Sequence, residues 1–156
     1  MVSKAKKKLW YLRRLCKLKA SVSTLLDIYQ KVIRSVMEQG APIYTGALTK
    51  TNIEEFESVQ KSAFKIILRG QYSDYSSALE TLEELTLEER RTKITLKFAK
   101  NSVKHPKMKH LFKKQVNLKA RKVKGENKFI EPRYNTNRAN NGPINYFIRL
   151  LNNNNL

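Results

Sequence analysis

The sequence is poor in cysteine, glycine, proline and acidic residues. Its 156 residues include one cysteine, five glycines, four prolines and 13 acidic residues, against 32 lysines and arginines. The single Cys16 excludes an intramolecular disulfide, and we expect it to be a buried thiol. No apolar run approaches the roughly 18 residues that a membrane span requires. Charges also interrupt the segment LWYLRRLCKLK that follows the basic start, so this start does not have the pattern of a secretory signal. We therefore expect an intracellular protein without a membrane partner.

The motifs of common enzyme sites are missing as well. The sequence has no Gly-rich phosphate loop and no Gly-x-Ser-x-Gly elbow. His105 and His110 do not have the spacing of zinc ligands. Glu54, Glu55 and Glu57 diverge around a helix, so we expect them to interact with a helix dipole rather than to bind a cation. These observations predict no enzyme, no catalytic residue, no metal and no cofactor.

The positive charge of the chain is large and unevenly distributed. The net charge is +19 at pH 7. Residues 1–53 contain 11 basic and two acidic side chains and carry +9. Residues 54–89 contain three basic and nine acidic side chains and carry −6. Residues 90–156 contain 18 basic and two acidic side chains and carry +16. This charge favours a polyanionic partner, and the hydrophobic content of 40% is too high for a purely disordered basic tail.

Two groups of basic residues are candidate phosphate contacts. The first surrounds Trp10 and Tyr11, and the second lies in the last third of the chain. The members are Lys4, Lys6, Lys7, Lys8, Arg13, Arg14 and Lys17 in the first group, and Lys113, Lys114, Lys119, Arg121, Lys122 and Lys124 in the second. We expect them to bind RNA or DNA through phosphates. The alternative is a solvated helix face and a disordered tail. Binding to a membrane surface is disfavoured because Trp10 is expected in the helical core.

The hydrophobic pattern predicts an all-α fold. Apolar residues recur at steps of three and four, and no segment alternates with a period of two. We expect an irregular bundle of about five helices followed by a basic, partly disordered C-terminal tail. The expected division is a helical domain over 1–104 and a basic extension over 105–156, with a short helix near 144–151. The asparagines at 152–155 are expected to form a frayed end.

Capping signals and stop signals predict the helix ends and the core. The first helix is expected over 4–19, a fourth near 78–85, and a connector at 41–46 that folds Ile43 and Tyr44 onto the core. The second helix is expected to begin at Ser21 or Ser23 and to end at Gly40. The third is expected to begin with a capping box of Thr51 and Glu54 and to end at Gly70. The fifth is expected to begin with a capping box of Thr86 and Glu89 and to end at Pro106. The residues expected to be buried together are Tyr29, Val32, Ile33, Val36, Phe56, Val59, Ala63, Ile66, Ile67, Leu82, Ile94 and Phe98.

Five segments carry a resemblance that covers nearly the entire chain in order. They are LWYLRRLCKL, LLDIYQKVIRSVMEQGAPIY, ESVQKSAFKIILRG, YSDYSSALETLEELTLEERRTKITLKFAKNSVKHPKMKHLF and EPRYNTNRANNGPINYFIRLLN. Together they resemble the C-terminal part of the reverse transcriptases of jockey-like non-LTR retrotransposons. The resemblance implies thumb helices that pack against a primer–template backbone, followed by a basic C-terminal portion. Two positions depart from the family pattern: Gln39 replaces an aromatic residue, and Tyr44 replaces a tryptophan.

The catalytic motif of that family is not in this sequence. The family's palm carries an Asp-Asp pair that binds the catalytic metals, and no Asp-Asp pair occurs here. We therefore expect a nucleic-acid-binding C-terminal segment of an RNA-directed DNA polymerase that lacks the palm. A palm domain in a longer parent protein is a second expected partner. The alternative is a non-functional remnant or a helical protein-interaction module, which would expose an apolar face.

Overall fold

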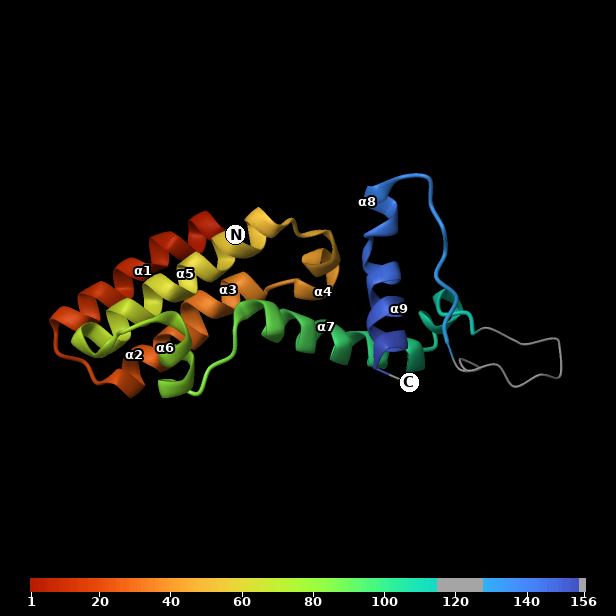
Figure 1. Cartoon of the computed structure of the whole chain (residues 1–156). Helices are drawn as coiled ribbons and strands as arrows, with labels where there is room; N and C mark the ends of the chain where they lie inside the picture. The colour runs from red at the N-terminus through yellow and green to blue at the C-terminus, as the bar shows by residue number, and fades with distance from the viewer. Residues whose placement is uncertain (115–127, 155–156) are drawn as a thin grey trace. The chain divides into compact units, whose positions relative to one another are not determined.

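The computed structural model describes residues 1–114 and 128–154 and divides the chain into two compact units (Figure 1). The first unit comprises Met1–Gln39 and Thr49–Arg90, and the second comprises Gly40–Leu48 and Arg91–Leu156. The described residues form helices and contain no β-strand, with one isolated antiparallel bridge between Lys114 and Phe129. The all-α prediction is therefore confirmed. The part of the predicted tail at 115–127 lies outside the described residues.

Three long helical segments pack together in the first unit. Helix α1 (Val2–Lys17) packs against α5 (Lys50–Leu68) (Figure 1). The C-terminal ends of both helices lie together, with Cys16 Sγ 3.6 Å from the Ile66 carbonyl oxygen. Cys16 is half-buried, and Arg69 Nε donates to its sulfur at 3.0 Å. The helices of this unit are α1 (Val2–Lys17), α2 (Val22–Ile28), η1 (Tyr29–Arg34), α3 (Ser35–Glu38), α5 (Lys50–Leu68), η3 (Arg69–Gln71), α6 (Tyr75–Thr81) and the start of α7 (Leu87–Lys104).

The second helical segment is continuous from α2 to α3 and contains a π-helical turn, η1. Its fully buried side chains are spaced by four residues: Leu25, Tyr29, Ile33 and Met37. A regular α-helix would rotate such a series steadily around its axis. Because a π turn contains more residues than an α turn, it keeps the series closer to one line. The π turn therefore directs one row of side chains into the core.

Two of the predicted helix starts and two of the stops agree with the structure. Helix α7 ends at Lys104, two residues before the predicted stop at Pro106. The Ser21 hydroxyl accepts a hydrogen bond from the Thr24 N–H at 3.2 Å and begins α2. Thr86 and Glu89 form a reciprocal capping box at the start of α7, with distances of 3.1 and 3.2 Å. Gly40 follows the end of α3 and has a φ of +70°, a conformation that favours glycine.

The predicted capping box at Thr51 and Glu54 is wrong. Helix α5 begins at Lys50, and the hydroxyl of Thr49 accepts from the Asn52 N–H at 3.3 Å. Thr49 has extended backbone and Thr51 is already helical, so Thr49 is the cap. As a result no acidic residue lies in the first turn of α5. The expected role of the three glutamates at its helix dipole is therefore also wrong.

The predicted core is confirmed in its centre and wrong at its edges. Phe98 is 44% exposed, and Phe64, which the pattern did not select, is fully buried with its ring centroid 5.4 Å from that of Tyr29. Val32, Val36, Ile66 and Ile94 are partly exposed. The expected core residues that are buried are Tyr29, Ile33, Phe56, Val59, Ala63, Ile67 and Leu82.

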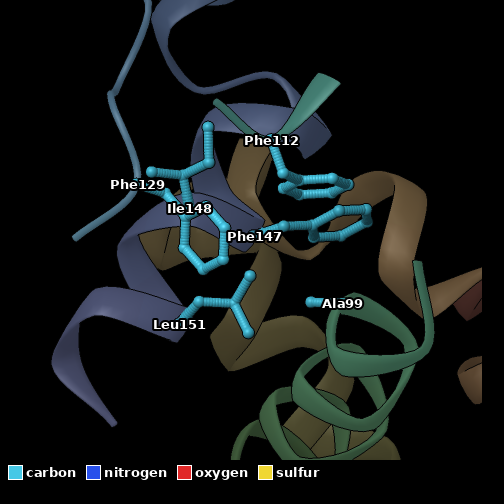
Figure 2. Packing of buried hydrophobic residues seen from close by; sticks show 6 residues of the cluster. All are labelled: Ala99, Phe112, Phe129, Phe147, Ile148 and Leu151. Atoms are coloured by element: carbon cyan, nitrogen blue, oxygen red, sulfur yellow. The ribbon is translucent and has the colours of Figure 1, made fainter. Parts of the chain in front are cut away.

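The second unit has its own apolar cluster, which joins α7 to α9 and to two segments between them. Figure 2 shows Ala99 of α7 with Phe112, Phe129, Phe147, Ile148 and Leu151. The helices that lie wholly in this unit are α4 (Ala41–Tyr44), η2 (Thr45–Ala47), η4 (Lys109–Leu111), α8 (Asn137–Asn140) and α9 (Pro143–Asn153). Because Ala99 packs with α9 residues, the unit boundary differs from the division that the sequence suggested at residue 104.

A glycine permits the close packing of η2 on α9. A Cβ atom at Gly46 would lie 2.6 Å from Tyr146 Cβ, which is shorter than the contacts that Cβ atoms make in proteins. Ile43, expected to fold onto the core, is instead 71% exposed on α4, while Tyr44 is half-buried. The connector is therefore a short helical segment, and both α4 and η2 contact α9.

Asparagine side chains fix the extended segment before α8. The amide of Asn152 donates to the Phe129 carbonyl at 3.0 Å and accepts from the Phe129 N–H at 2.9 Å. Asn140 makes the same pair of bonds with the backbone of Tyr134 at 2.9 and 3.0 Å. Each side-chain amide thus takes the place of a neighbouring strand's peptide group. Asn152 is consequently a structural residue rather than part of a frayed end.

Candidate nucleic-acid interface

The first predicted basic group lies on α1, which has one buried face and one charged face. Ala5, Leu9 and Leu12 are buried against the rest of the first unit. Their spacing of three and four residues follows the helical repeat, so the residues between them point away from the core. The exposed basic side chains of α1 are Lys4, Lys6, Lys7, Arg13, Arg14 and Lys17.

Lys8 differs from the other predicted members of this group. It is half-buried, and its Nζ donates a hydrogen bond to the Val32 carbonyl at 3.2 Å. Val32 lies in the π turn η1, so the contact joins α1 to the irregular part of the neighbouring helix. Lys8 therefore contributes to the contact between α1 and η1 rather than to the exposed charge. The six exposed cations form what we call the α1 basic face.

Trp10 and Tyr11 lie on the exposed side of α1. Trp10 is 59% exposed and Tyr11 is 50% exposed, so the expectation that Trp10 lies in the core is wrong. Trp10 follows the buried Leu9 by one position, which rotates it about 100° from that residue and away from the core. The two rings make an edge-to-face contact with centroids 5.3 Å apart. The α1 basic face therefore contains an accessible aromatic pair.

None of the ion pairs within the described residues includes a side chain of α1. Helix α1 contains no acidic residue of its own. Six like charges on one helix face repel one another, and no described carboxylate pairs with them. The α1 basic face is consequently an uncompensated positive surface.

Several acidic side chains of the first unit have other partners. Glu57 accepts a hydrogen bond from the hydroxyl of Tyr75 and another from the Glu88 N–H at the start of α7, at 3.0 Å. The Asp74 carboxylate accepts from the Ser77 N–H at 3.1 Å and caps α6. Burial and the hydrogen bond to Glu57 raise the pKa of Tyr75 above its ordinary value. The acidic middle segment is thus used in part for helix caps and internal contacts.

The second predicted basic group is only partly within the described residues. Lys113 and Lys114 are exposed, and Lys114 Nζ lies 6.0 Å from the centroid of the Phe129 ring. Lys119, Arg121, Lys122 and Lys124 lie outside the described residues. A cavity of about 210 Å³ in this unit is lined by Lys100, Val103, Lys104, Lys114, Phe129 and Leu151.

The sequence interpretation did not select Lys100 and Lys104 as part of this group. They are four residues apart, which places both on one face of α7. That spacing is visible in the sequence, but their proximity to Lys114 depends on how the segment after α7 folds back. The second unit therefore has three lysines around one small cavity with a mainly apolar lining.

Within residues 1–114 and 128–154, no group of three or more His, Cys, Asp or Glu side chains is arranged to hold a metal ion. Glu54 and Glu55 are exposed on α5, and His105 Nδ1 accepts from the Lys107 N–H at 3.3 Å. No helix in the described part of the chain is long and apolar enough to span a membrane.

Comparisons with known proteins do not assign the chain to a family. No protein-family model, no curated protein and no solved structure matches it. The function is therefore inferred from the residues and the geometry described above.

Proposed function

We propose that this chain binds nucleic acid without strong sequence preference, through phosphate contacts of the α1 basic face. The observation that carries the proposal is the uncompensated charge of α1: six exposed cations, no acidic residue in the helix, and no ion pair to it from the described residues. Phosphates are the groups that such cations neutralise when nucleic acid binds, with release of counterions. The overall charge of +19 adds long-range attraction.

A second contact in the proposal is the lysine group of the other unit. Lys100, Lys104 and Lys114 are brought together around one cavity, and Lys113 is exposed beside Lys114. The remaining members, Lys119, Arg121, Lys122 and Lys124, join the proposal on the basis of the sequence alone. Two basic sites on one chain would raise the apparent affinity for a long strand that reaches both.

We further propose that the module is a thumb-type C-terminal segment of a non-LTR retrotransposon reverse transcriptase, without its palm. The resemblance supports this origin, and the observed helical fold agrees with it. In this proposal the segment holds a primer–template but does not extend it, because the sequence has no Asp-Asp pair for two catalytic metals. A palm domain in a longer parent protein is the proposed protein partner.

The alternative, a remnant or a protein-interaction module, requires an unpartnered apolar face. In the first unit the large exposed apolar side chains are Met1, Trp10, Tyr11, Leu18 and Val22. Met1, Trp10, Tyr11 and Leu18 belong to α1 or to its capping positions, whereas Val22 begins α2. Trp10 and Tyr11 lie among the cations of α1. This mixture of aromatic and basic groups is more typical of a nucleic-acid surface than of a helix-packing face.

Fluorescence anisotropy with labelled oligonucleotides tests the proposal. The double variant Lys7→Gln/Arg14→Gln removes two charges from the α1 basic face and is expected to weaken binding severalfold. The control Lys31→Gln/Lys50→Gln removes the same charge from exposed positions on η1 and α5, and it is expected to bind nearly as the wild type. Equal losses in both variants, or no binding at low salt, would contradict the proposal.

A primer-extension assay tests the proposed lack of polymerase activity. The purified chain is incubated with template, primer, nucleotides and divalent metal, and no incorporation is expected. Reproducible incorporation that is lost on mutation of Asp27, Asp74 or Glu57 would overturn the proposed palm-less segment.

A further inference from the structure

We propose that Trp10 and Tyr11 form a stacking platform for unpaired nucleobases, so that the α1 basic face prefers single-stranded nucleic acid. This inference rests on the proposed function, because it names the form of nucleic acid that the same face binds. It concerns the aromatic pair, whereas the proposed function depends on the cations. The two claims therefore predict different losses on mutation.

The first observation is the exposure of two adjacent aromatic side chains in edge-to-face contact. Both rings are at least half exposed, and their planes are inclined by 74°. The contact restricts each ring's motion relative to the other, which lowers the entropy lost when a further ring stacks on the pair. Exposed aromatics that stack on successive bases are the common device of proteins that bind single strands.

The second observation is the identity of the helical neighbours of Trp10. Residues three and four positions away lie next to a given side chain on a helix surface. For Trp10 these four neighbours are Lys6, Lys7, Arg13 and Arg14, all of them basic and all exposed. An occupant must therefore present an aromatic or apolar ring at the centre and negative groups on both sides.

An unpaired segment of nucleic acid meets these two requirements. Its bases have accessible faces, and its phosphates lie along the same strand on either side of each base. In a duplex the base faces are covered by their neighbours, so only the phosphates would contact α1. The central aromatic pair would then add little to the affinity for a duplex.

A lipid surface fits the same face less well. A helix that lies in a membrane interface inserts a broad apolar face between lipid headgroups. In α1 the aliphatic face is already buried in the first unit through Ala5, Leu9 and Leu12. The exposed side offers one aromatic pair among six cations, which is little apolar area for insertion.

Trp10 provides the measurement, since it is the only tryptophan in the chain. We propose to titrate the full chain with oligothymidylate, with an abasic strand of equal length and with heparin, and to record Trp10 emission. Stacking predicts that oligothymidylate quenches the emission, while the abasic strand and heparin bind with little change. Equal quenching by all three polyanions would overturn the stacking proposal. If none of the three polyanions binds, the proposed function is rejected instead.

Variants at position 10 separate stacking from apolar contact. Trp10→Phe keeps a ring, whereas Trp10→Leu keeps an apolar side chain without one. Trp10→Leu is expected to weaken oligothymidylate binding by about 5- to 150-fold, the range for loss of one base–aromatic contact. Its affinity for the abasic strand should be unchanged, which also serves as the test of folding. The affinity of Trp10→Phe for oligothymidylate should lie between the affinities of Trp10→Leu and the wild type.

Two further results would overturn the inference. One is an equal affinity of wild type and Trp10→Leu for oligothymidylate. The other is binding to phosphatidylserine vesicles, with a blue shift of Trp10 emission, that is tighter than binding to oligothymidylate at the same ionic strength.

Discussion

Arg34 Nη1 lies 2.7 and 2.6 Å from the two carboxylate oxygens of Glu84, a residue 50 positions further along the chain. Both side chains are mostly buried, with exposed fractions of 13% for Arg34 and 5% for Glu84. Gln30 Nε2 donates to the same carboxylate at 2.6 Å. Glu38 extends the network, with its carboxylate 3.7 Å from Arg34 and 2.5 Å from Arg90.

This network joins the π turn to the start of α7 and uses acidic groups inside the first unit. The hydrogen bond to Glu38 raises the pKa of Arg90 above its ordinary value, so the Arg90 guanidinium keeps its charge at physiological pH. The internal carboxylates are therefore bound to cations other than those of α1. This arrangement leaves the α1 basic face with its full charge.

Breaking the network is expected to destabilise the first unit. Glu84→Ala leaves Arg34 largely buried and with only the more distant Glu38, at 3.7 Å, for a partner. Removal of one partner of a buried pair costs about 3 kcal/mol in the free energy of unfolding. The control Asp27→Ala breaks the exposed pair with Lys31 and should change that free energy by less than about 0.5 kcal/mol. Urea denaturation followed by circular dichroism measures both values, and equal effects would contradict the assigned role of Glu84.

Truncation of core residues tests the packing of the first unit. Ile33 and Ile67 are fully buried, so Ile33→Ala and Ile67→Ala are each expected to lower the free energy of unfolding by about 2–5 kcal/mol. Trp10→Ala removes a larger side chain but from an exposed position, and its effect should stay below about 0.5 kcal/mol. Chemical denaturation of the three variants decides this. A larger loss for Trp10→Ala than for the isoleucine variants would mean that α1 is rotated about its axis.

The two threonines at the start of α5 provide a test of its capping residue. Thr49→Ala removes the hydroxyl that accepts the Asn52 N–H and is expected to cost about 1 kcal/mol. Thr51→Ala lies inside the first turn and is expected to be neutral or slightly stabilising, since alanine has the higher helix propensity. Thermal unfolding of both variants would show a lower melting temperature for Thr49→Ala alone. The opposite order would restore the capping box that the sequence suggested.

Tyr29 should make the fold sensitive to alkaline pH. Burial raises the pKa of Tyr29 above its ordinary value of 10.0, so the folded chain keeps the phenol neutral where the unfolded chain ionises it. Stability from this group is therefore complete below pH 10 and decreases as the pH rises above it. The Tyr29 hydroxyl is buried without a hydrogen-bond partner in the described part of the chain.

The variant Tyr29→Phe isolates this effect. It is expected to be at least as stable as the wild type at pH 7, because it removes an unsatisfied buried hydroxyl. Its free energy of unfolding should also fall less between pH 9 and pH 11. Urea titrations at these two pH values make the comparison, and a loss above pH 10 equal to that of the wild type would contradict it.

Local signals in the sequence were sufficient for several helix ends but not for the contacts between helices. Thr86 and Glu89 are three residues apart, so their capping box is visible in the sequence. At α5 the sequence permits either Thr49 or Thr51 as the N-cap. Which of the two caps the helix depends on where the backbone changes from extended to helical. The hydrophobic character of Trp10 favours a core position, but its place in the helical repeat, one residue after the buried Leu9, puts it on the exposed side of α1.

Long-range contacts could not be predicted from the sequence. The bond of Glu57 to the Glu88 N–H joins residues 31 positions apart, and that of Asn152 to Phe129 joins residues 23 apart. Such pairs arise only after the helices have packed, and no local periodicity encodes them. The candidate interface was predictable as a set of basic residues, whereas the separate position of Lys8 and the exposure of the aromatic pair required the structure.

The salt dependence of duplex binding tests the central claim most directly, because it counts the phosphates that the α1 basic face is proposed to neutralise. With about six contacts, the slope of log K against log salt should be near −5 for the wild type. Lys7→Gln/Arg14→Gln should be shallower by about two, whereas Lys31→Gln/Lys50→Gln should keep the wild-type slope. A flat dependence for the wild type, or the same slope in all three proteins, would contradict the account.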